Sequence, residues 1–125
     1  MRLPSSAGLL SSTCLAAALV LCSGCHSAYI DATVSNRSSQ PLALLEVDYP
    51  SASFGTQVLA PGQDFHYRFK ILGSGDLALL YTDVHHQEMH FAGPHMGETD
   101  EGSLSVVVGP TGPQWNLHLK NRPAS

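Results

Sequence analysis

The chain has no cysteine after Cys25, and its three cysteines are Cys14, Cys22 and Cys25. A domain formed by the later residues therefore has no internal disulfide and depends on its hydrophobic core. The chain also lacks an apolar run of the ~20 residues that a membrane-spanning helix requires. The residues from Cys25 onward number 125 − 24 = 101, which is a usual size for one domain.

Basic residues are scarce as well. The chain has six Lys and Arg against ten Asp and Glu, a formal net charge of −4, and Arg2 is the only charged residue before Cys25. Without residues 1–24 the balance is 5 − 10 = −5. An acidic surface without a basic stripe repels phosphate backbones, so we expect no nucleic-acid partner.

Familiar catalytic motifs are missing. The chain has no phosphate-binding P-loop and no dinucleotide fingerprint. Its nearest approach to the G-x-S-x-G nucleophile motif is Gly73-Ser74-Gly75, whose spacing is wrong and is typical of a turn. We therefore expect a protein that is not an enzyme, with no catalytic residue, no cofactor and no cofactor-binding residue.

What the chain does have is the order of a secretory signal: Arg2, an apolar segment from Leu15 to Leu21, then small residues before a cysteine. The stretch Ser23-Gly24-Cys25 matches the last three places of a lipobox, so residues 1–25 resemble the signal of a bacterial lipoprotein precursor. Cys22 stands where that motif usually has an aliphatic residue. The resemblance implies lipidation of Cys25: a diacylglyceryl group joins its thiol, and cleavage makes it the first residue.

Two alternatives stay open at this point. One is an ordinary signal peptide cleaved near Ala28, and the other is an uncleaved membrane anchor, for which the apolar segment is too short. Lipidation of Cys25 has the advantage that it accounts for a cysteine that would otherwise be an unpaired exported thiol.

The lipoprotein interpretation divides the chain into a signal peptide (1–24), a short tether (25–29), a folded domain (30–120) and a C-terminal tail (121–125). At about 3.3–3.6 Å per residue the tether spans at most ~18 Å, which keeps the domain close to the membrane. His26 replaces the Asp that favours inner-membrane retention in enterobacteria, so the resemblance implies an outer-membrane location facing the periplasm. The expected partners are the membrane, through acylated Cys25, and an unidentified envelope protein or ligand.

Residues 30–120 alternate between apolar and polar positions with a period of two, which indicates β-strands. The clearest case is the run of Phe65, Tyr67, Phe69 and Ile71, which predicts a core position for Phe69. No segment has a helical period. Seven or eight short strands separated by turn residues predict an all-β domain, a small antiparallel β-sandwich of the immunoglobulin-like kind. A small β-barrel is the alternative, because alternation does not reveal whether a sheet closes.

The same pattern sets approximate boundaries. Ala60-Pro61-Gly62-Gln63 has Pro and Gly at the central positions of a type II turn. Residues 50–53 are expected to interrupt the chain between strands, and residues 92–101 to form a loop. The expected strands cover residues 30–35, 43–49, 56–59, 65–71, 77–82, 87–91, 104–108 and 115–119.

All seven histidines follow Cys25, and the segment 85–96 contains four of them with Met89 and Met96. If residues 86–90 form a strand, then His86, Glu88 and His90 share one face, and the alternative function is a periplasmic copper or zinc protein. A regular strand, however, separates His86 from His90 by roughly 13 Å, too far for one ion without a bend. The other interpretation is an ordinary solvent-facing strand, and we assign no metal ligand.

Three further features have simple interpretations. Glu98, Asp100 and Glu101 lack the spacing of an EF-hand loop and indicate a solvated turn. The sequon Asn36-Arg37-Ser38 carries little meaning in a bacterial lipoprotein. Trp115 follows a turn cluster, outside the densest alternation, and is expected to be exposed at an edge.

Overall fold

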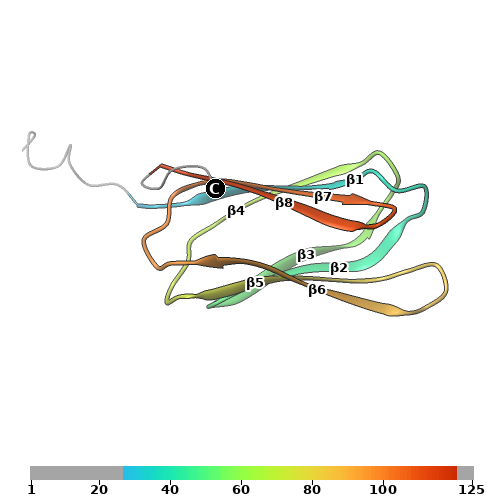
Figure 1. The fold of residues 1–125 in the computed structure, drawn as a ribbon, viewed down its shortest axis with the longest axis horizontal. Coiled ribbons are helices and arrows are strands. Elements are labelled where there is room, and N and C mark those ends of the chain that lie inside the picture. Colours follow the sequence, from blue (N-terminus) through green and yellow to red (C-terminus); the bar gives the residue numbers. More distant parts are fainter. Residues whose placement is uncertain (1–26, 121–125) are drawn as a thin grey trace, which may run out of the picture.

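The computed structural model describes residues 27–120, which form eight β-strands in two facing layers (Figure 1). This part of the chain contains no helix. The strands are β1 (Ile30–Asn36), β2 (Leu42–Tyr49), β3 (Ala52–Leu59), β4 (Asp64–Phe69), β5 (Gly75–Thr82), β6 (Glu88–Met96), β7 (Gly102–Gly109) and β8 (Gly112–Leu119).

The two sheets have the strand orders β4-β1-β7-β8 and β3-β2-β5-β6. Neither sheet closes on itself within residues 27–120, so the β-sandwich prediction is confirmed and the barrel alternative is wrong. Five of the six strand pairings are antiparallel. The sixth differs from a purely antiparallel arrangement, because β1 and β7 pair in parallel with Ile30 opposite Gly102.

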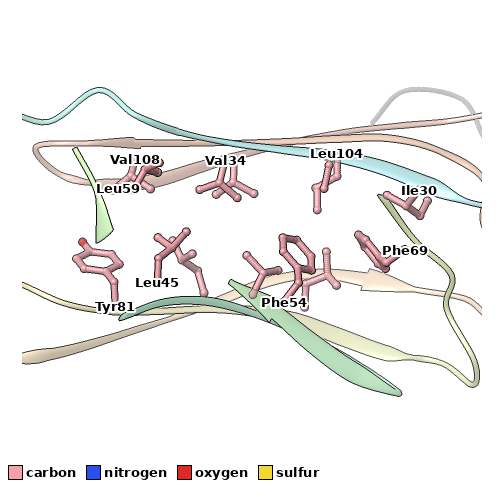
Figure 2. Close-up of a cluster of buried hydrophobic side chains, with 14 of the residues drawn as sticks. Ile30, Val34, Leu45, Phe54, Leu59, Phe69, Tyr81, Leu104 and Val108 are labelled. Atoms are coloured by element: carbon pink, nitrogen blue, oxygen red, sulfur yellow. The ribbon is translucent and has the colours of Figure 1, made fainter. Parts of the chain in front are cut away.

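The core lies between the sheets, where the inward-facing residues of the strands meet (Figure 2). Val34 and Leu104 of one sheet point toward Leu45 and Phe54 of the other. The exposed fraction of Phe69 is 3%, which confirms the prediction that this residue belongs to the core. The buried apolar side chains are Ile30, Ala32, Val34, Leu42, Leu45, Val47, Phe54, Leu59, Phe69, Ile71, Leu77, Leu79, Tyr81, Met96, Leu104, Val106 and Val108.

Aromatic residues fill the two sides of the sandwich differently. On the side of β3 and β4, the ring of Phe54 stacks on Tyr67 with 4.6 Å between centroids and lies 5.3 Å from Phe69. On the side of β6 and β8, Trp115 lies over the backbone at Gly93, where an added Cβ would come within 2.7 Å of the ring. Trp115 is therefore on an edge strand, as expected, but it is half-buried against the core rather than exposed.

The connections gather at two ends of the sandwich (Figure 1). The tether end is the one where β1 begins at Ile30, and it also holds the connections 50–51, 70–74 and 97–101. The far end holds the connections 37–41, 60–63, 83–87 and 110–111. At 60–63 the predicted type II turn is confirmed, because Gly62 has φ 81° and the amide of Gln63 donates to the carbonyl of Ala60 at 3.0 Å.

The two largest errors in the predicted boundaries concern β6 and β3. Strand β6 continues to Met96 where a loop was expected; the unusual Pro94 is tolerated because β6 is an edge strand, whose outer amides need no ladder partner. Strand β3 begins at Ala52, because the interruption after Tyr49 is only a two-residue connection, Pro50-Ser51, between paired residues Tyr49 and Ala52.

Candidate functional site

Cys25, the residue expected to be lipidated, lies outside the described residues 27–120, and so do His26 and the rest of the signal segment. The structure shows that the domain behind this segment begins its first strand at Ile30. Within residues 27–120, no helix is long and apolar enough to cross a bilayer.

The histidine segment is spread over a turn and an edge strand. His86 lies in the turn between β5 and β6 with φ 61°, Glu88 begins β6, and His90 lies further along the same strand; all three are exposed. The chain does turn before Glu88, yet among the described residues no three His, Cys, Asp or Glu side chains lie close enough together to hold a metal ion. The metal-binding alternative therefore has no support from the geometry.

The other members of this segment have structural contacts. Nδ1 of His95 lies 2.9 Å from the carboxylate of Asp76 on the adjacent strand, and both side chains are exposed. Met96 is fully buried in the core, and Met89 packs against the core from its edge. The two methionines are thus explained by packing.

The acidic loop, residues 97–101 between β6 and β7, is fixed by contacts of its carboxylates within the domain. The carboxylate of Asp100 accepts a hydrogen bond from the amide of Gly97 at 2.7 Å, and Glu101 pairs with Lys120 at 3.1 Å. These contacts agree with the interpretation of a solvated turn, since the carboxylates bind the chain itself.

Asn36 of the sequon is a structural residue. Its side chain is fully buried; its amide donates to the carbonyls of Gln40 and Leu59, and its oxygen accepts from the amide and hydroxyl of Ser38. A buried side chain with these partners cannot carry a glycan in the folded domain. It fixes the connection between β1 and β2 at the far end.

Two surface hollows lie at opposite ends of the domain. The hollow at the tether end, of about 350 Å³, is polar, and its acids and bases largely pair with each other, as Arg68 does with Asp31 at 3.6 Å. The hollow at the far end, of about 300 Å³, has Tyr81 beside it, and burial raises the pKa of this phenol. Residues around the far hollow include Gln40, Pro41, Tyr81, Val84, His85 and Pro110.

The outer face of β2 and β3 is the most unusual surface of the domain. The name β2–β3 surface is used for its outward residues, which are Leu44, Glu46, Asp48, Ser53, Gly55 and Val58. The pairing of β2 with β5 shifts between Ala43 and Glu46, and Leu44 inside this bulge has φ 50°. A left-handed conformation costs a residue with a β-carbon about 1–2 kcal/mol, and strain of this kind gathers at functional positions.

The strained leucine is also exposed. The side chain of Leu44 is 60% exposed, and Val58 on the neighbouring strand is 53% exposed. Val58 lies opposite Ala43, the residue before Leu44, so the side chains of Leu44 and Val58 are one position apart across the β2–β3 pairing. They form an apolar patch in the half of this surface nearer the far end.

The other half of the β2–β3 surface is acidic. Glu46 and Asp48 lie opposite the small residues Gly55 and Ser53. The pKa of Glu46 is raised because the Asp48 carboxyl hydrogen-bonds to it and repels its charge, and the Ser53 hydroxyl partly offsets this. Oδ1 of Asp48 is covered and has no hydrogen-bond partner among the described residues.

A shallow groove of about 270 Å³ runs along this surface. Gly55 lines it, and a Cβ at this position would overlap the backbone carbonyl of Leu45. The groove is bordered by Glu46 of β2 and by Ser53 and Gly55 of the edge strand β3. This surface was not predicted from the sequence. Glu46 and Asp48 alternate with Leu45 and Val47, which places the two acids on one face. Their pairing with Gly55 and Ser53, however, depends on the strand register.

Comparison with known proteins shows the fold and no more. No protein-family profile matches the chain, and no curated protein matches it. A protein from Eubacterium rectale, solved by NMR, is similar in structure, with a TM-score of 0.55 at 6% sequence identity over 76% of this chain and 93% of that chain. The TM-score supports a shared fold, whereas identity this low does not imply a shared function.

Proposed function

We propose that this chain is a bacterial envelope lipoprotein, anchored in the membrane through acylated Cys25, whose β-sandwich acts by binding a partner and not as an enzyme. The observation that carries the proposal is Ser23-Gly24-Cys25 directly behind the apolar segment from Leu15 to Leu21. Lipidation uses up the one cysteine that an exported chain would otherwise carry unpaired. A second signal, such as additional acyl chains, is needed for stable anchoring, since one chain binds only reversibly.

The fold is compatible with this role. The first strand begins at Ile30, five residues after Cys25, and a tether of that length spans at most ~18 Å. A domain held this close presents its tether end to the membrane and its far end and outer sheet faces to the periplasm. The replacement of Asp by His26 after the cysteine supports an outer-membrane location.

Mass spectrometry of the protein purified from bacterial membranes tests the anchor. We expect an N-terminal Cys25 that carries acyl mass, and we expect Cys25→Ser to move the protein from the membrane to the soluble fraction. Cys22→Ser is the matched control and should change neither result, because it leaves with the signal. A mature chain that begins at any residue other than Cys25 contradicts the proposal.

A further inference from the structure

Strand β3 differs from the other strands at the edges of the two sheets. The four edge strands are β4, β8, β3 and β6. Charged residues, histidines or prolines interrupt three of them: Asp64, His66 and Arg68 in β4, Glu88, His90, Pro94 and His95 in β6, and Pro113 and His118 in β8. Strand β3 has none of these in eight residues, Ala52–Leu59.

Charges and prolines are the usual devices that prevent an edge strand from pairing with another chain. In β3 the carbonyl of Leu59 accepts from the buried Asn36 side chain. No strand of the described residues pairs with the edge of β3 that faces away from β2. The unprotected edge therefore runs along most of β3 and offers backbone amides and carbonyls to a partner.

The β2–β3 surface lies directly beside this edge and has two chemically distinct halves. Near the far end, exposed Val58 and strained, exposed Leu44 form an apolar patch. Toward the tether end, Glu46 and Asp48 lie opposite Gly55 and Ser53, whose small size leaves the carboxylates accessible from the edge. A strand added beside β3 would meet the apolar half near Val58 and the acidic half near Gly55 and Ser53.

We propose that β3 accepts an extended segment of a partner protein as an added antiparallel strand, with apolar residues next to Val58 and Lys or Arg next to Gly55 and Ser53. The backbone hydrogen bonds supply the attachment and the alternate side chains supply the choice of partner. A basic residue in that position reaches Glu46 and Asp48 across the glycine and offers a donor to Oδ1 of Asp48.

A second copy of this chain does not fit the surface. Strand β3 has no basic residue, so a paired β3 brings no cation to Glu46 and Asp48. Antiparallel pairing also reverses the second domain, and eight strand residues extend ~27 Å. A tether of at most ~18 Å cannot bring that reversed copy back to the same membrane. The argument from tether length rests on the proposed anchor, whereas the observations on the β3 edge and the β2–β3 surface are independent of it.

A labelled peptide tests the proposal on the full mature protein purified in detergent. The probe is the fluorescein-labelled peptide Ile-Thr-Val-Thr-Lys-Thr-Lys-Thr. When antiparallel pairing sets its two lysines opposite Gly55 and Ser53, its isoleucine and valine lie on either side of the position opposite Val58. We expect saturable binding by fluorescence anisotropy. Hydrogen–deuterium exchange should show that the peptide slows exchange in β3 and leaves the other edge strands β4, β6 and β8 unchanged.

Variants test the two halves separately. Val58→Lys places a charge on the edge and is expected to weaken peptide binding by about tenfold or more, whereas Ala92→Lys, an exposed position of the opposite edge strand β6, should leave it unchanged. Glu46→Gln with Asp48→Asn should weaken binding about threefold to tenfold, because exposed charge pairs contribute modestly. Circular dichroism checks that each variant is folded.

Absence of binding at millimolar peptide, equal binding of a peptide with Glu in place of Lys, or slowed exchange in β4, β6 or β8 instead of β3 would overturn the inference. Dimerisation of the unliganded protein through β3 would show that the occupant is a second copy and would also overturn it. None of these outcomes affects the acyl-mass measurement at Cys25, so failure of this inference is distinct from failure of the proposed anchor.

Discussion

The two edges of the sheet β3-β2-β5-β6 are protected unequally. Strand β6 carries Glu88, His90 and Pro94, and Trp115 from the facing sheet covers its backbone at Gly93. Strand β3 carries no charge or proline, and its Gly55 leaves a groove beside the edge. Within one sheet, one edge therefore has the usual protection against strand addition and the other lacks it.

The largest expected effect concerns the core residues beneath the two edges. Phe54 of β3 is 6% exposed and packs against four aromatic rings, so Phe54→Ala should lower the free energy of unfolding by ~3–5 kcal/mol. Phe91 of β6 is half-buried, and Phe91→Ala should cost about 1–2 kcal/mol. Urea unfolding followed by circular dichroism measures both. Equal losses would show that the two edges are packed equally.

The glycines beneath the edges come next. A Cβ at Gly55 overlaps the backbone of Leu45, whereas a Cβ at Gly93 meets the ring of Trp115. A side-chain ring moves more readily than a paired backbone, so Gly55→Ala should destabilise more than Gly93→Ala, within about 1–3 kcal/mol for overpacking. Urea midpoints give the order, and the fluorescence of Trp115 should change for Gly93→Ala only. A larger loss at Gly93 would contradict this order.

The smallest effect is electrostatic and concerns Glu46 beside β3. The hydrogen bond with the Asp48 carboxyl and the repulsion from its charge raise the pKa of Glu46. The folded chain therefore binds this proton more tightly than the unfolded chain, so the two ionised carboxylates weaken the fold above the folded pKa. Glu46→Gln should therefore melt slightly higher than the unmodified protein at pH 7. The difference should disappear as the pH falls through the raised pKa and below 4.5.

Thermal melting at pH 7 and pH 4 tests this electrostatic effect, and Glu88→Gln on β6 controls for the loss of one negative charge. A stabilisation of Glu46→Gln that persists unchanged at pH 4 would mean that repulsion between the carboxylates is not its cause.

Alternation along the sequence was sufficient to predict strands such as β4 and the burial of Phe69, since period two is a local property of the chain. The inward face of β2 was only partly predicted. Ala43, Leu45, Val47 and Tyr49 were expected to share a face, but the bulge at Leu44 inserts one residue and buries Leu42 in place of Ala43. Bulges depend on the neighbouring strand, which the sequence of β2 alone does not contain.

The candidate surface was harder to predict for the same reason. The first half of β3, residues 52–55, was missed, because Ala52, Ser53 and Gly55 are not among the β-branched and aromatic residues that indicate strands. Its position at an edge follows from the strand order of the sheet, which is decided by contacts between distant residues. The pairing of Glu46 with Gly55, on which the groove depends, is a property of register and not of either strand alone.

The parallel pairing of β1 with β7 has a consequence for how the domain forms. Ile30 pairs with Gly102, which is 102 − 30 = 72 residues away, and β1 lies in the interior of its sheet between β4 and β7. When the chain is synthesised from its N-terminus, the backbone groups on one side of β1 have no partner strand until β7 has been made. Contacts of this separation form slowly, so we expect the domain to stay open while it is incomplete and to close in one late step.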